Sequence, residues 1–482
     1  MKGFVGRRPL LERLETEVGE IRRTGQGRLV TIRGRRRIGK SWLVEEFVER
    51  SGLPNVFFAA SGQTPERELS LFAEQVARSR LPAAELASNV RFETWEAALV
   101  AAASGAELAA PSVIVLDEFP DLCEFKRGPD GEITGSPQEG SLRKAWDQVL
   151  SRRPVLLVLI GSDLSMMEAL TVYGRPLYQR PSRELVVPPL NPREVAAMTG
   201  LTGAEALESY LVTGGFPKIA AAWGSGGLRP FLERSLADDG SPLVATGRLI
   251  LEAEFRASVQ ARSVLSAIGM GARTNKSIAG ATGITTNHLT YPFKVLIDKR
   301  VIATKLPLSM KASSDRRYVV ADPYLRFYLR YLDGAYGEIE RGRGRVLVPR
   351  ILSTWETYVG MAVEPVVREA IEQILPDDRL GDAAVVGGFW NRDHSIEVDL
   401  IGSNRREPPV QEISFIGSIK WRQRRPATSS DVADLIRSGA RVPGVAPDTR
   451  LVLVTRSGVQ DVGLPVAAIL TPDELLASYP LD

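Results

Sequence analysis

Short aliphatic runs alternate with polar and helical stretches in the first part of the chain. The runs are residues 30–32 (VTI), 113–116 (VIVL) and 155–160 (VLLVLI). Uninterrupted apolar runs of this length are typical of parallel strands that are covered on both faces. After the first run, residues 42–48 have the apolar spacing of an amphipathic helix. This alternation predicts an α/β domain built on a parallel sheet.

Helical patterns replace the strands in the middle of the chain. Residues 192–223 indicate short amphipathic helices around a Gly214-Gly215 turn, and they fit either a lid over a ligand or a structural subdomain. Residues 255–318 then indicate three helices followed by two short strands, at residues 301–303 and 317–320. This order predicts a winged helix-turn-helix module.

The third helix of this module carries the side chains that would meet a partner. Its exposed positions are Thr286, Asn287, His288, Thr290 and Lys294. Asn287 and His288 are suited to reading base edges. Pro292 is expected to kink or shorten the helix, because proline lacks an N–H and clashes with the preceding turn. The module therefore predicts either a double-stranded DNA partner or a protein partner.

A second α/β pattern occupies the end of the chain. Residues 341–345 (RGRGR) form a basic, glycine-rich stretch that indicates a domain boundary. Residues 355–374 have the pattern of one long helix. The predicted strands are residues 384–386, 396–401, 410–415, 417–421 and 451–455, with a further helix near residues 431–438. This alternation predicts a separate C-terminal α/β domain.

The first strand leads into a phosphate-binding motif. Residues 34–41 are GRRRIGKS and match G-x-x-x-x-G-K-[ST] at each fixed position. Gly34 and Gly39 allow the backbone to curl so that its N–H groups point at phosphate oxygens. Lys40 is predicted to reach the β- and γ-phosphates, and Ser41 to bind Mg²⁺. The motif therefore predicts a nucleoside triphosphate site at the start of the following helix.

Acids after the second strand supply the other half of such a site. Asp117 directly follows the run at residues 113–116 and is predicted to hold Mg²⁺ through water. Glu118 is placed to act as the general base that polarises an attacking water. Ligands of doubly wound sheets lie beyond the carboxyl ends of the strands, so Ser162 or Asp163 is a candidate sensor of the γ-phosphate. Catalysis is accordingly assigned to Lys40 and Glu118.

Arginines supply the remaining candidates in this region. One of Arg175, Arg180 and Arg183 is expected to approach the phosphates as an arginine finger, with Arg175 and Arg180 preferred; a solvated surface role is the alternative. Three further arginines occupy variable positions of the phosphate loop, where side chains point away from the phosphates. They are expected to meet a neighbouring domain or solvent, and they are Arg35, Arg36 and Arg37.

The C-terminal domain contains part of a nuclease pattern. Metal-dependent nucleases of the restriction-enzyme type need an acid on one strand and Glu/Asp-x-Lys on the next, because carboxylates bind Mg²⁺ and the lysine steadies the attacking water. Asp399 matches the first acid, Lys420 the lysine, and Glu364 an acid on the preceding helix. Ser418 stands where the second carboxylate belongs, and serine lacks the negative charge that a hard cation needs. The sequence thus predicts an inactive or repurposed domain.

Composition narrows these predictions. The chain has 482 residues, and 61 basic against 58 acidic residues give a net charge of +3. This near balance does not favour nucleic-acid binding, so that function must depend on local patches. A single cysteine, Cys123, excludes a disulfide framework, and His288 and His394 lie too far apart in sequence to suggest a metal site. We expect a cytoplasmic protein, because no signal-peptide pattern is present and residues 155–160 are too few to span a bilayer.

The ordered combination of motifs resembles the archaeal-type ATPases of the STAND and AAA+ neighbourhood. Many members carry a C-terminal domain of unknown function (DUF234-type) related to restriction nucleases. The matching segments are FVGR at residues 4–7, GRRRIGKS at 34–41, VIVLDEF at 113–119, LIGSDLSMM at 159–167, LVTGGFP at 211–217 and YVVADPYLRF at 318–327. The resemblance implies ATP as the nucleotide. The nucleotide-binding residues are then Gly6 and Arg7 at the adenine end, with Gly34, Arg35, Arg36, Arg37, Ile38, Gly39, Lys40, Ser41, Trp42 and Ser162.

We therefore predict an α/β multidomain protein with four parts. They are a P-loop ATPase core with a parallel sheet at residues 1–190, a helical lid at 191–254, a winged helix at 255–340 and an inactive PD-(D/E)xK-like domain at 341–482. The leading hypothesis is an ATP-binding, Mg²⁺-dependent ATPase that acts as a regulatory switch. One alternative is a DNA-binding protein whose nucleotide state gates DNA engagement or cleavage. Another is a nucleotide-binding scaffold without turnover, and oligomerisation is compatible with each hypothesis.

Overall fold

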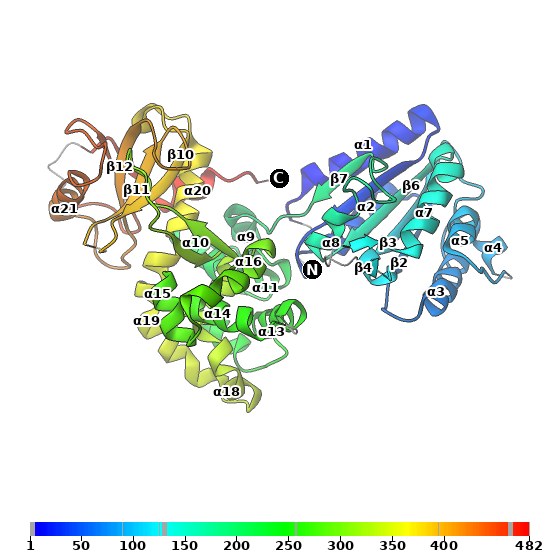
Figure 1. Ribbon diagram of the computed structural model, residues 1–482, viewed down its shortest axis with the longest axis horizontal. Helices are drawn as coiled ribbons and strands as arrows, with labels where there is room; N and C mark the ends of the chain where they lie inside the picture. Colours follow the sequence, from blue (N-terminus) through cyan, green and yellow to red (C-terminus); the bar gives the residue numbers. More distant parts are fainter. Residues whose placement is uncertain are drawn as a thin grey trace. The chain divides into compact units, whose positions relative to one another are not determined.

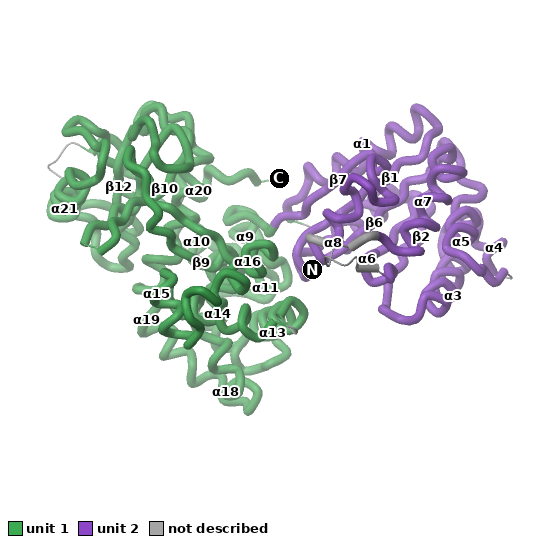
Figure 2. The backbone as a smooth tube through the Cα atoms, in the orientation of Figure 1, with its two compact units in different colours: residues 1–5, 189–481 green, residues 6–188, 482 purple. Residues whose placement is uncertain are grey.

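The computed structural model describes residues 5–88, 90–124, 126–127, 133–255, 258–393, 395–460 and 466–481. These form two compact units (Figure 2). The N-terminal unit is residues 6–188, and the described residues of the C-terminal unit are Val5 and those within 189–481. Within the described ranges, no helix is long and apolar enough to cross a membrane.

The N-terminal unit is built on a five-stranded parallel sheet (Figure 1). Its strands follow the spatial order β2 (Asn55–Ala59), β3 (Ser112–Asp117), β6 (Val155–Gly161), β1 (Arg28–Arg33) and β7 (Arg183–Val186). Strands β3 and β6 are buried along their whole length, as continuous aliphatic runs require. Because β6 lies between β1 and β3, the residues after β6 are placed between the phosphate loop and the acidic pair.

Helices surround this sheet and begin or end at recognisable signals. Helix α2 (Lys40–Ser51) begins after Gly39, and α1 (Arg8–Thr24) ends at Gly25 in the left-handed conformation. The hydroxyl of Ser136 caps α7 (Pro137–Gln148) by accepting from Glu139 N. The other elements of this unit are α3 (Pro65–Ala77), α4 (Ala84–Ala87), α5 (Trp95–Ala102), α6 (Phe119–Leu122), α8 (Leu164–Ala169), and the pair β4 (Lys126–Arg127) and β5 (Ile133–Gly135). The predicted parallel α/β architecture is confirmed.

The C-terminal unit begins with a group of helices. They are α9 (Pro192–Thr199), α10 (Gly203–Thr213), α11 (Pro217–Ala221), α12 (Leu228–Ser235) and α13 (Pro242–Phe255). The Gly214-Gly215 turn that ends α10 has φ angles of 57° and 74°. A Cβ on Gly215 would lie 2.1 Å from the carbonyl oxygen of Leu190. The second glycine is therefore required by a close approach of two backbones as well as by its conformation.

Three helices and a hairpin follow in the predicted order, and we call residues 259–320 the helix–hairpin module. The elements are α14 (Val259–Gly269), α15 (Asn275–Thr282), α16 (Thr290–Asp298), β8 (Ile302–Lys305) and β9 (Arg317–Val320). Helix α16 begins at Thr290, directly after a 3₁₀ turn, so Pro292 lies in its first turn. A proline is tolerated there because the first N–H groups of a helix have no partner within it.

The prediction of one long helix at residues 355–374 is wrong. The chain forms α19 (Leu347–Ala362) and α20 (Glu364–Ile374), which meet at Val363. Pro365 explains the break, because it has no N–H to donate to the preceding turn and is tolerated only at the start of a helix. Two shorter helices precede this pair, α17 (Pro323–Tyr331) and α18 (Tyr336–Glu340). The stretch at residues 341–345 does not divide compact units, since residues 189–481 cluster together.

A mixed five-stranded sheet completes the C-terminal unit. Its spatial order is β10 (Val385–Trp390), β11 (Glu397–Ser403), β12 (Ile413–Lys420), β13 (Arg450–Thr455) and β14 (Ala468–Leu470). The first two pairings are antiparallel and the last two are parallel. Helix α20 packs against β10, and α21 (Ser429–Gly439) against β11 and β12 (Figure 1). Helix α22 (Pro472–Ala477) packs against α10 and α20. The predicted C-terminal α/β part is confirmed.

A buried carboxylate joins the helical part to this sheet. Glu208 of α10 accepts hydrogen bonds from Trp421 Nε1 at 3.0 Å, Arg456 Nε at 2.6 Å and Trp355 Nε1 at 3.4 Å. Trp355 belongs to α19, whereas Trp421 and Arg456 directly follow β12 and β13. These bonds satisfy a carboxylate that would otherwise be costly to bury, so they fix the relative placement of these elements within the C-terminal unit.

Candidate functional site

The phosphate loop of the N-terminal unit connects β1 to α2. Gly39 has a φ of 91° and Arg37 a φ of 66°, so the loop takes the tight left-handed turns that expose backbone N–H groups. A Cβ on Gly34 would lie 2.7 Å from the carbonyl oxygen of Val187, which explains a glycine at the first fixed position. Ile38 is fully buried. The motif therefore has its strand, loop and helix in the order that phosphate binding requires.

Two predicted residues approach this loop from the start of the chain. Gly6 and Arg7 both have left-handed backbones, with φ angles of 72° and 67°. Arg7 is buried, and its Nη2 donates to the carbonyl oxygen of Ile38 at 2.8 Å. Phe4, the first residue of the matching FVGR segment, lies outside the described residues. Arg7 thus braces the phosphate loop, and its role at the adenine end stays a prediction.

Lys40 is turned back onto the loop that precedes it. Its Nζ donates to the carbonyl oxygens of Gly34 at 3.0 Å and Arg35 at 3.1 Å. Burial lowers the pKa of Lys40 to about 8, against the opposing attraction of Glu118 and Asp117. The ammonium is therefore held by neutral acceptors that a phosphate can replace with stronger, charge-assisted hydrogen bonds.

Ser41 and Asp117 bring two oxygens together at the end of the sheet. Ser41 Oγ donates to Asp117 Oδ2 at 2.6 Å, and Asp117 Oδ1 accepts from the backbone N–H of Glu118 at 2.9 Å. Burial raises the pKa of Asp117, and the bond from Ser41 opposes that rise. A hydroxyl and a carboxylate are ligands of the kind Mg²⁺ takes when phosphates and water complete its coordination. The residues present therefore fit the predicted metal.

Glu118 is held in a strained and specific position. Its φ of 50° is left-handed, which a residue with a side chain rarely adopts and which is typical of functional sites. Its Oε2 accepts from the backbone N–H of Ser162 at 3.0 Å and from Ser162 Oγ at 2.8 Å. Ser162, predicted to sense the γ-phosphate, thus orients the predicted general base. Asp163 caps α8 by accepting from Met166 N.

The arginine candidates are engaged in ion pairs within the same unit. Arg175 is buried and its Nη2 lies 2.6 Å from Glu139 Oε1. Arg180 makes two bonds of 2.8 Å to the carboxylate of Asp147. The arginine-finger role of Arg175 or Arg180 stays a prediction. Arg183 pairs with Glu17 at 2.7 Å.

The variable side chains of the phosphate loop differ in exposure. Arg36 and Arg37 are exposed and Arg35 is half-buried. Trp42, in the first turn of α2, is 40% exposed.

Sequence reasoning missed a residue that supports this site. Glu68 of α3 is buried, and its Oε1 accepts from Ser61 N at 2.9 Å, Ser61 Oγ at 2.8 Å and Gln63 N at 2.8 Å. This fixes the segment after β2, where Ala60 N donates to the carbonyl oxygen of Asp117. No motif contains Glu68, so only its burial and its bonds identify it.

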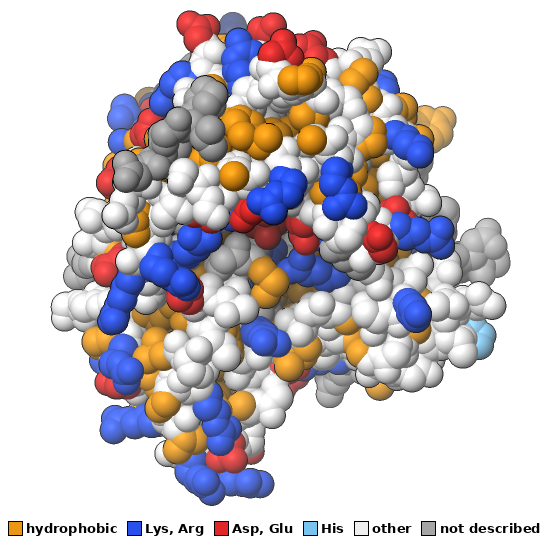
Figure 3. Space-filling view, turned by 90° about the vertical axis from the view of Figure 1, so that its left-hand side faces the viewer, with side chains coloured by type: hydrophobic (Ala, Val, Ile, Leu, Met, Phe, Trp, Pro, Cys, Tyr) orange, Lys and Arg blue, Asp and Glu red, His pale blue; other side chains and the backbone are white. Residues whose placement is uncertain are grey.

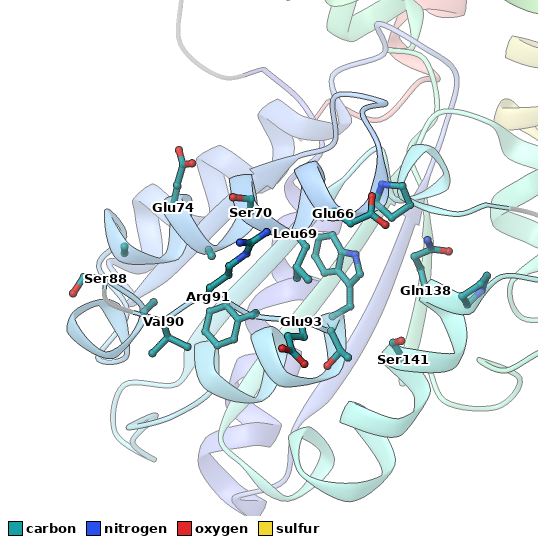
Figure 4. Close-up of a pocket in the computed structure, with 18 of the residues that line it drawn as sticks. Glu66, Leu69, Ser70, Glu74, Ser88, Val90, Arg91, Glu93, Gln138 and Ser141 are labelled. Carbon is teal, nitrogen blue, oxygen red and sulfur yellow. The ribbon is translucent and has the colours of Figure 1, made fainter.

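The N-terminal unit also contains a cavity that lies apart from the phosphate loop and from the Asp117–Glu118 pair. Its volume is about 870 Å³, and it is lined by α3, the segment before α5 and the start of α7. In Figure 4, Glu66 and Ser70 extend from α3, and Gln138 and Ser141 from α7. No residue of the phosphate loop and neither Asp117 nor Glu118 lines it. Size alone therefore does not identify the site.

The nuclease-like residues of the C-terminal unit are brought near one another but have other partners. Asp399 Oδ2 accepts from Ser418 Oγ at 3.0 Å and from the backbone N–H of Ile419 at 2.8 Å. Glu364 pairs with Arg368 at 2.9 Å, and Lys420 lies 3.6 Å from Asp431. Among the described residues, no group of three or more His, Cys, Asp or Glu is arranged to hold a metal.

The chain is similar to several known proteins. Residues 328–432 match the DUF234 family, described as archaea bacterial proteins of unknown function, so the predicted C-terminal family is confirmed. An uncharacterised protein of Methanocaldococcus jannaschii is 25% identical over 402 residues, which cover 82% of each chain. A solved Walker-type ATPase of Pyrococcus abyssi is similar with a TM-score of 0.46 and 19% identity, over 68% of this chain and 96% of that one. The Aeropyrum pernix ORC2 protein, solved as ADPNP-ADP complexes, gives a TM-score of 0.41 at 16% identity, over 72% and 95%.

Proposed function

We propose that the N-terminal unit binds and hydrolyses ATP with Mg²⁺, and that its nucleotide state acts as a regulatory switch. One observation carries this proposal: Lys40, the Ser41–Asp117 pair and Glu118 converge at the carboxyl edge of one parallel sheet. Ligands of open α/β sheets bind at that edge. ATP rather than another nucleotide depends on the family resemblance and on Gly6 and Arg7.

Each residue has a separable role in this proposal. The loop N–H groups and Lys40 bind the phosphates, and Lys40 exchanges its carbonyl partners for phosphate oxygens. Ser41 and Asp117 would hold Mg²⁺, which neutralises charge on the phosphate oxygens. Glu118 accepts a proton from the attacking water. Ser162 keeps the Glu118 carboxylate oriented until the substrate is bound.

The switch is supported by the backbone hydrogen bonds at the two ends of residues 187–190, which connect the two units. Val187 N donates to the carbonyl oxygen of Arg33 at 2.8 Å, directly before the phosphate loop. Leu190 N donates to the carbonyl oxygen of Gly215 at 3.0 Å. Only Pro188 and Pro189 lie between these anchors, and proline restricts the backbone. A rearrangement of the loop on binding nucleotide would thus act on a short, stiff connection.

Steady-state ATP hydrolysis tests the catalytic part. We expect Lys40→Ala and Glu118→Gln each to lower turnover by about 100-fold or more. Glu118→Gln should retain ATP binding, because the loop is intact. Glu49→Gln, an exposed glutamate of α2, is the matched control and should leave turnover unchanged. Binding of ATP without turnover in the unaltered protein would favour the scaffold alternative.

Limited proteolysis with ADP and with a non-hydrolysable ATP analogue tests the switch. Cleavage within the C-terminal unit should differ between the two nucleotides in the unaltered protein. Replacing both prolines of the connection, Pro188→Gly with Pro189→Gly, should reduce that difference while ATP binding persists, since flexibility weakens the coupling. Identical cleavage with both nucleotides would contradict the switch.

DNA binding is the second candidate, favoured by the exposed side chains of the helix–hairpin module. Thr286, Asn287, His288 and Thr290 are exposed, and Tyr291 beside them is 68% exposed. Lys294 is exposed as well and pairs with Asp298. Binding of a short duplex that weakens steeply with salt and is lost in Asn287→Ala with His288→Ala would support it.

We also infer that the C-terminal sheet does not cleave DNA, and Mg²⁺-dependent cleavage that Asp399→Ala abolishes would disprove this.

A further inference from the structure

A second, smaller cavity lies inside the C-terminal unit, between the helix–hairpin module and the helices of the DUF234 domain. It has a volume of about 250 Å³. It is lined by the end of α14, the hairpin β8–β9, α17 and the junction of α19 and α20. Neither Asp399 nor Lys420 lines it. Of the three nuclease-like residues, Glu364 alone lines the cavity.

The ionisable side chains that line this cavity are mostly basic. They are Arg273, Lys305, Arg326, Arg330 and Arg368, with Glu364 as the single carboxylate among the lining residues. Glu364 is already paired with Arg368. The face of the C-terminal unit in Figure 3 also carries Lys and Arg side chains across its middle and lower parts. The cavity thus has an excess of positive charge.

The other four basic groups have only weak or neutral partners among the described residues. Arg273 Nη2 donates to the thioether sulfur of Met361 at 3.0 Å, and a thioether is a poor acceptor. Arg326 donates to the carbonyl oxygens of Val320 and Ala362, and Arg330 to that of Met270. No described group forms a hydrogen bond or ion pair with Lys305. A binding anion would therefore not have to displace a carboxylate.

A buried hydroxyl adds a second, independent sign of a ligand. Tyr358 lines the cavity and is 6% exposed. Its hydroxyl is buried without a hydrogen-bond partner among the described residues. Burying a polar group without a partner is costly, and such groups in native structures call for an explanation. An anion accepting from this hydroxyl would supply the missing partner.

Burial shifts the pKa of several groups that line the cavity. Burial lowers the pKa of Lys305, and repulsion from Arg368 and Arg406 adds to that effect. Burial also lowers the pKa of Arg326, against the attraction of Tyr358 and Glu364. Burial raises the pKa of Glu364, although Arg368 and Arg273 oppose that rise. Removal from water is therefore the main cause of each shift.

We propose that this cavity binds a phosphate-ester anion between the helix–hairpin module and the DUF234 domain. Lys305, Arg273 and Arg330 contact the phosphate oxygens, and the Tyr358 hydroxyl donates to one of them. The apolar side chains of Met270 and Met361 accept the remainder of the ligand. The phosphate belongs either to a small ester or to a nucleic-acid backbone. The site is independent of the proposed ATPase, because no residue of the N-terminal unit lines it.

Calorimetric titration of the full chain tests the site, with Lys40→Ala as the background so that the phosphate loop contributes little. The probes are glycerol 3-phosphate and a short DNA duplex. Replacing Lys305→Gln with Arg330→Gln should weaken binding about tenfold for each lost charge-assisted bond. The matched control, Lys276→Gln with Lys311→Gln, removes two exposed charges that do not line the cavity and should leave affinity unchanged.

Tyr358→Phe separates a ligand contact from a structural role. Removing an unpartnered hydroxyl should leave the urea unfolding midpoint unchanged or raise it, while affinity for the probe falls. Binding of the ester assigns the site to a small ligand, and binding of the duplex alone assigns it to a nucleic-acid backbone. Absence of binding by both probes, or equal affinity in the cavity and control variants, would overturn the proposal.

Discussion

The protein contains two clusters of acids and a lysine at sheets of similar size, and their side chains are engaged differently. In the N-terminal unit, Lys40 is held by neutral carbonyl oxygens and Asp117 by one hydroxyl and one backbone N–H. In the C-terminal unit, Lys420 faces the carboxylate of Asp431, which also holds Arg422 at 2.7 Å. Asp399 accepts from Ser418 and from the backbone of Ile419.

This difference shows that residue types alone do not make a site. A ligand can replace carbonyl oxygens around an ammonium at little cost, because the new bonds are charge-assisted. Displacing a carboxylate from a buried ion pair leaves a charge without compensation. Ser418 gives Asp399 a structural partner and offers no charge to a cation. The first cluster is thus open to exchange, whereas the second is closed by its own neighbours.

The largest expected effect is on turnover when the two aspartates are replaced in parallel. Asp117→Asn should lower steady-state ATP hydrolysis by about 100-fold or more, since it removes a charged metal ligand. Asp399→Asn should leave hydrolysis unchanged, because its bonds lie within the C-terminal sheet. Equal losses in both variants would contradict the assignment of catalysis to the N-terminal unit.

The same two positions should behave in the opposite way when stability is measured. Asp399→Ala leaves a part-buried backbone N–H without its acceptor, so it should cost about 1–3 kcal/mol of unfolding free energy. Asp117→Ala should cost less. Burial raises the pKa of Asp117, so keeping this carboxylate ionised at neutral pH lowers the free energy of unfolding of the unaltered protein. This loss of stability disappears at a pH below the ordinary pKa of aspartate, where the group is protonated in both the folded and the unfolded state. Urea unfolding curves of both variants at pH 7 compare them, and a larger cost at Asp117 would reverse the comparison.

A smaller effect should appear in the pH dependence of ATP binding. Burial lowers the pKa of Lys40 to about 8, so the ammonium form that attracts phosphate is depleted as pH rises through that value. ATP affinity should fall by up to roughly tenfold for each pH unit above 8. Titrations at pH 7, 8 and 9 measure the slope. Lys40→Arg is the control, because arginine stays protonated, and a slope that persists in it would assign the titration to another group.

The smallest expected effect is at the lysine of the C-terminal cluster. Lys420→Ala should change the unfolding free energy by less than about 1 kcal/mol, because its partner lies 3.6 Å away and Asp431 keeps Arg422. Urea unfolding measures this change, with Arg422→Ala as the comparison. A cost above that of Arg422→Ala would show that Lys420 has a stronger role than the geometry gives it.

Local patterns predicted many elements of both units. The aliphatic runs gave β1, β3 and β6, and the phosphate loop predicted the start of α2 at Lys40. The order of three helices and a hairpin followed from apolar spacing. The single long helix was wrong because the apolar spacing continues across Val363, where α19 and α20 meet just before Pro365. Apolar spacing describes side chains only, so it gives no sign of the backbone N–H that Pro365 lacks.

The partners of the candidate residues could not be predicted in this way. Ser162 was a candidate for contact with phosphate, and in the fold it orients Glu118 because β6 lies between β1 and β3. Arg175 was a candidate finger, and it is buried against Glu139. Glu68 belongs to no motif. These contacts join residues far apart in the chain, so they depend on strand order and helix packing.

The sequence by itself determined which residues can carry the chemistry, because GRRRIGKS, the Asp117–Glu118 pair and the missing carboxylate at Ser418 are local features. Only the tertiary structure decided which of them remain available to a ligand. Hydrogen bonding and burial set that availability, and both depend on neighbours that the fold brings together. For the same reason, a cavity lined by basic groups from the helix–hairpin module and the DUF234 domain is visible only once the chain is folded.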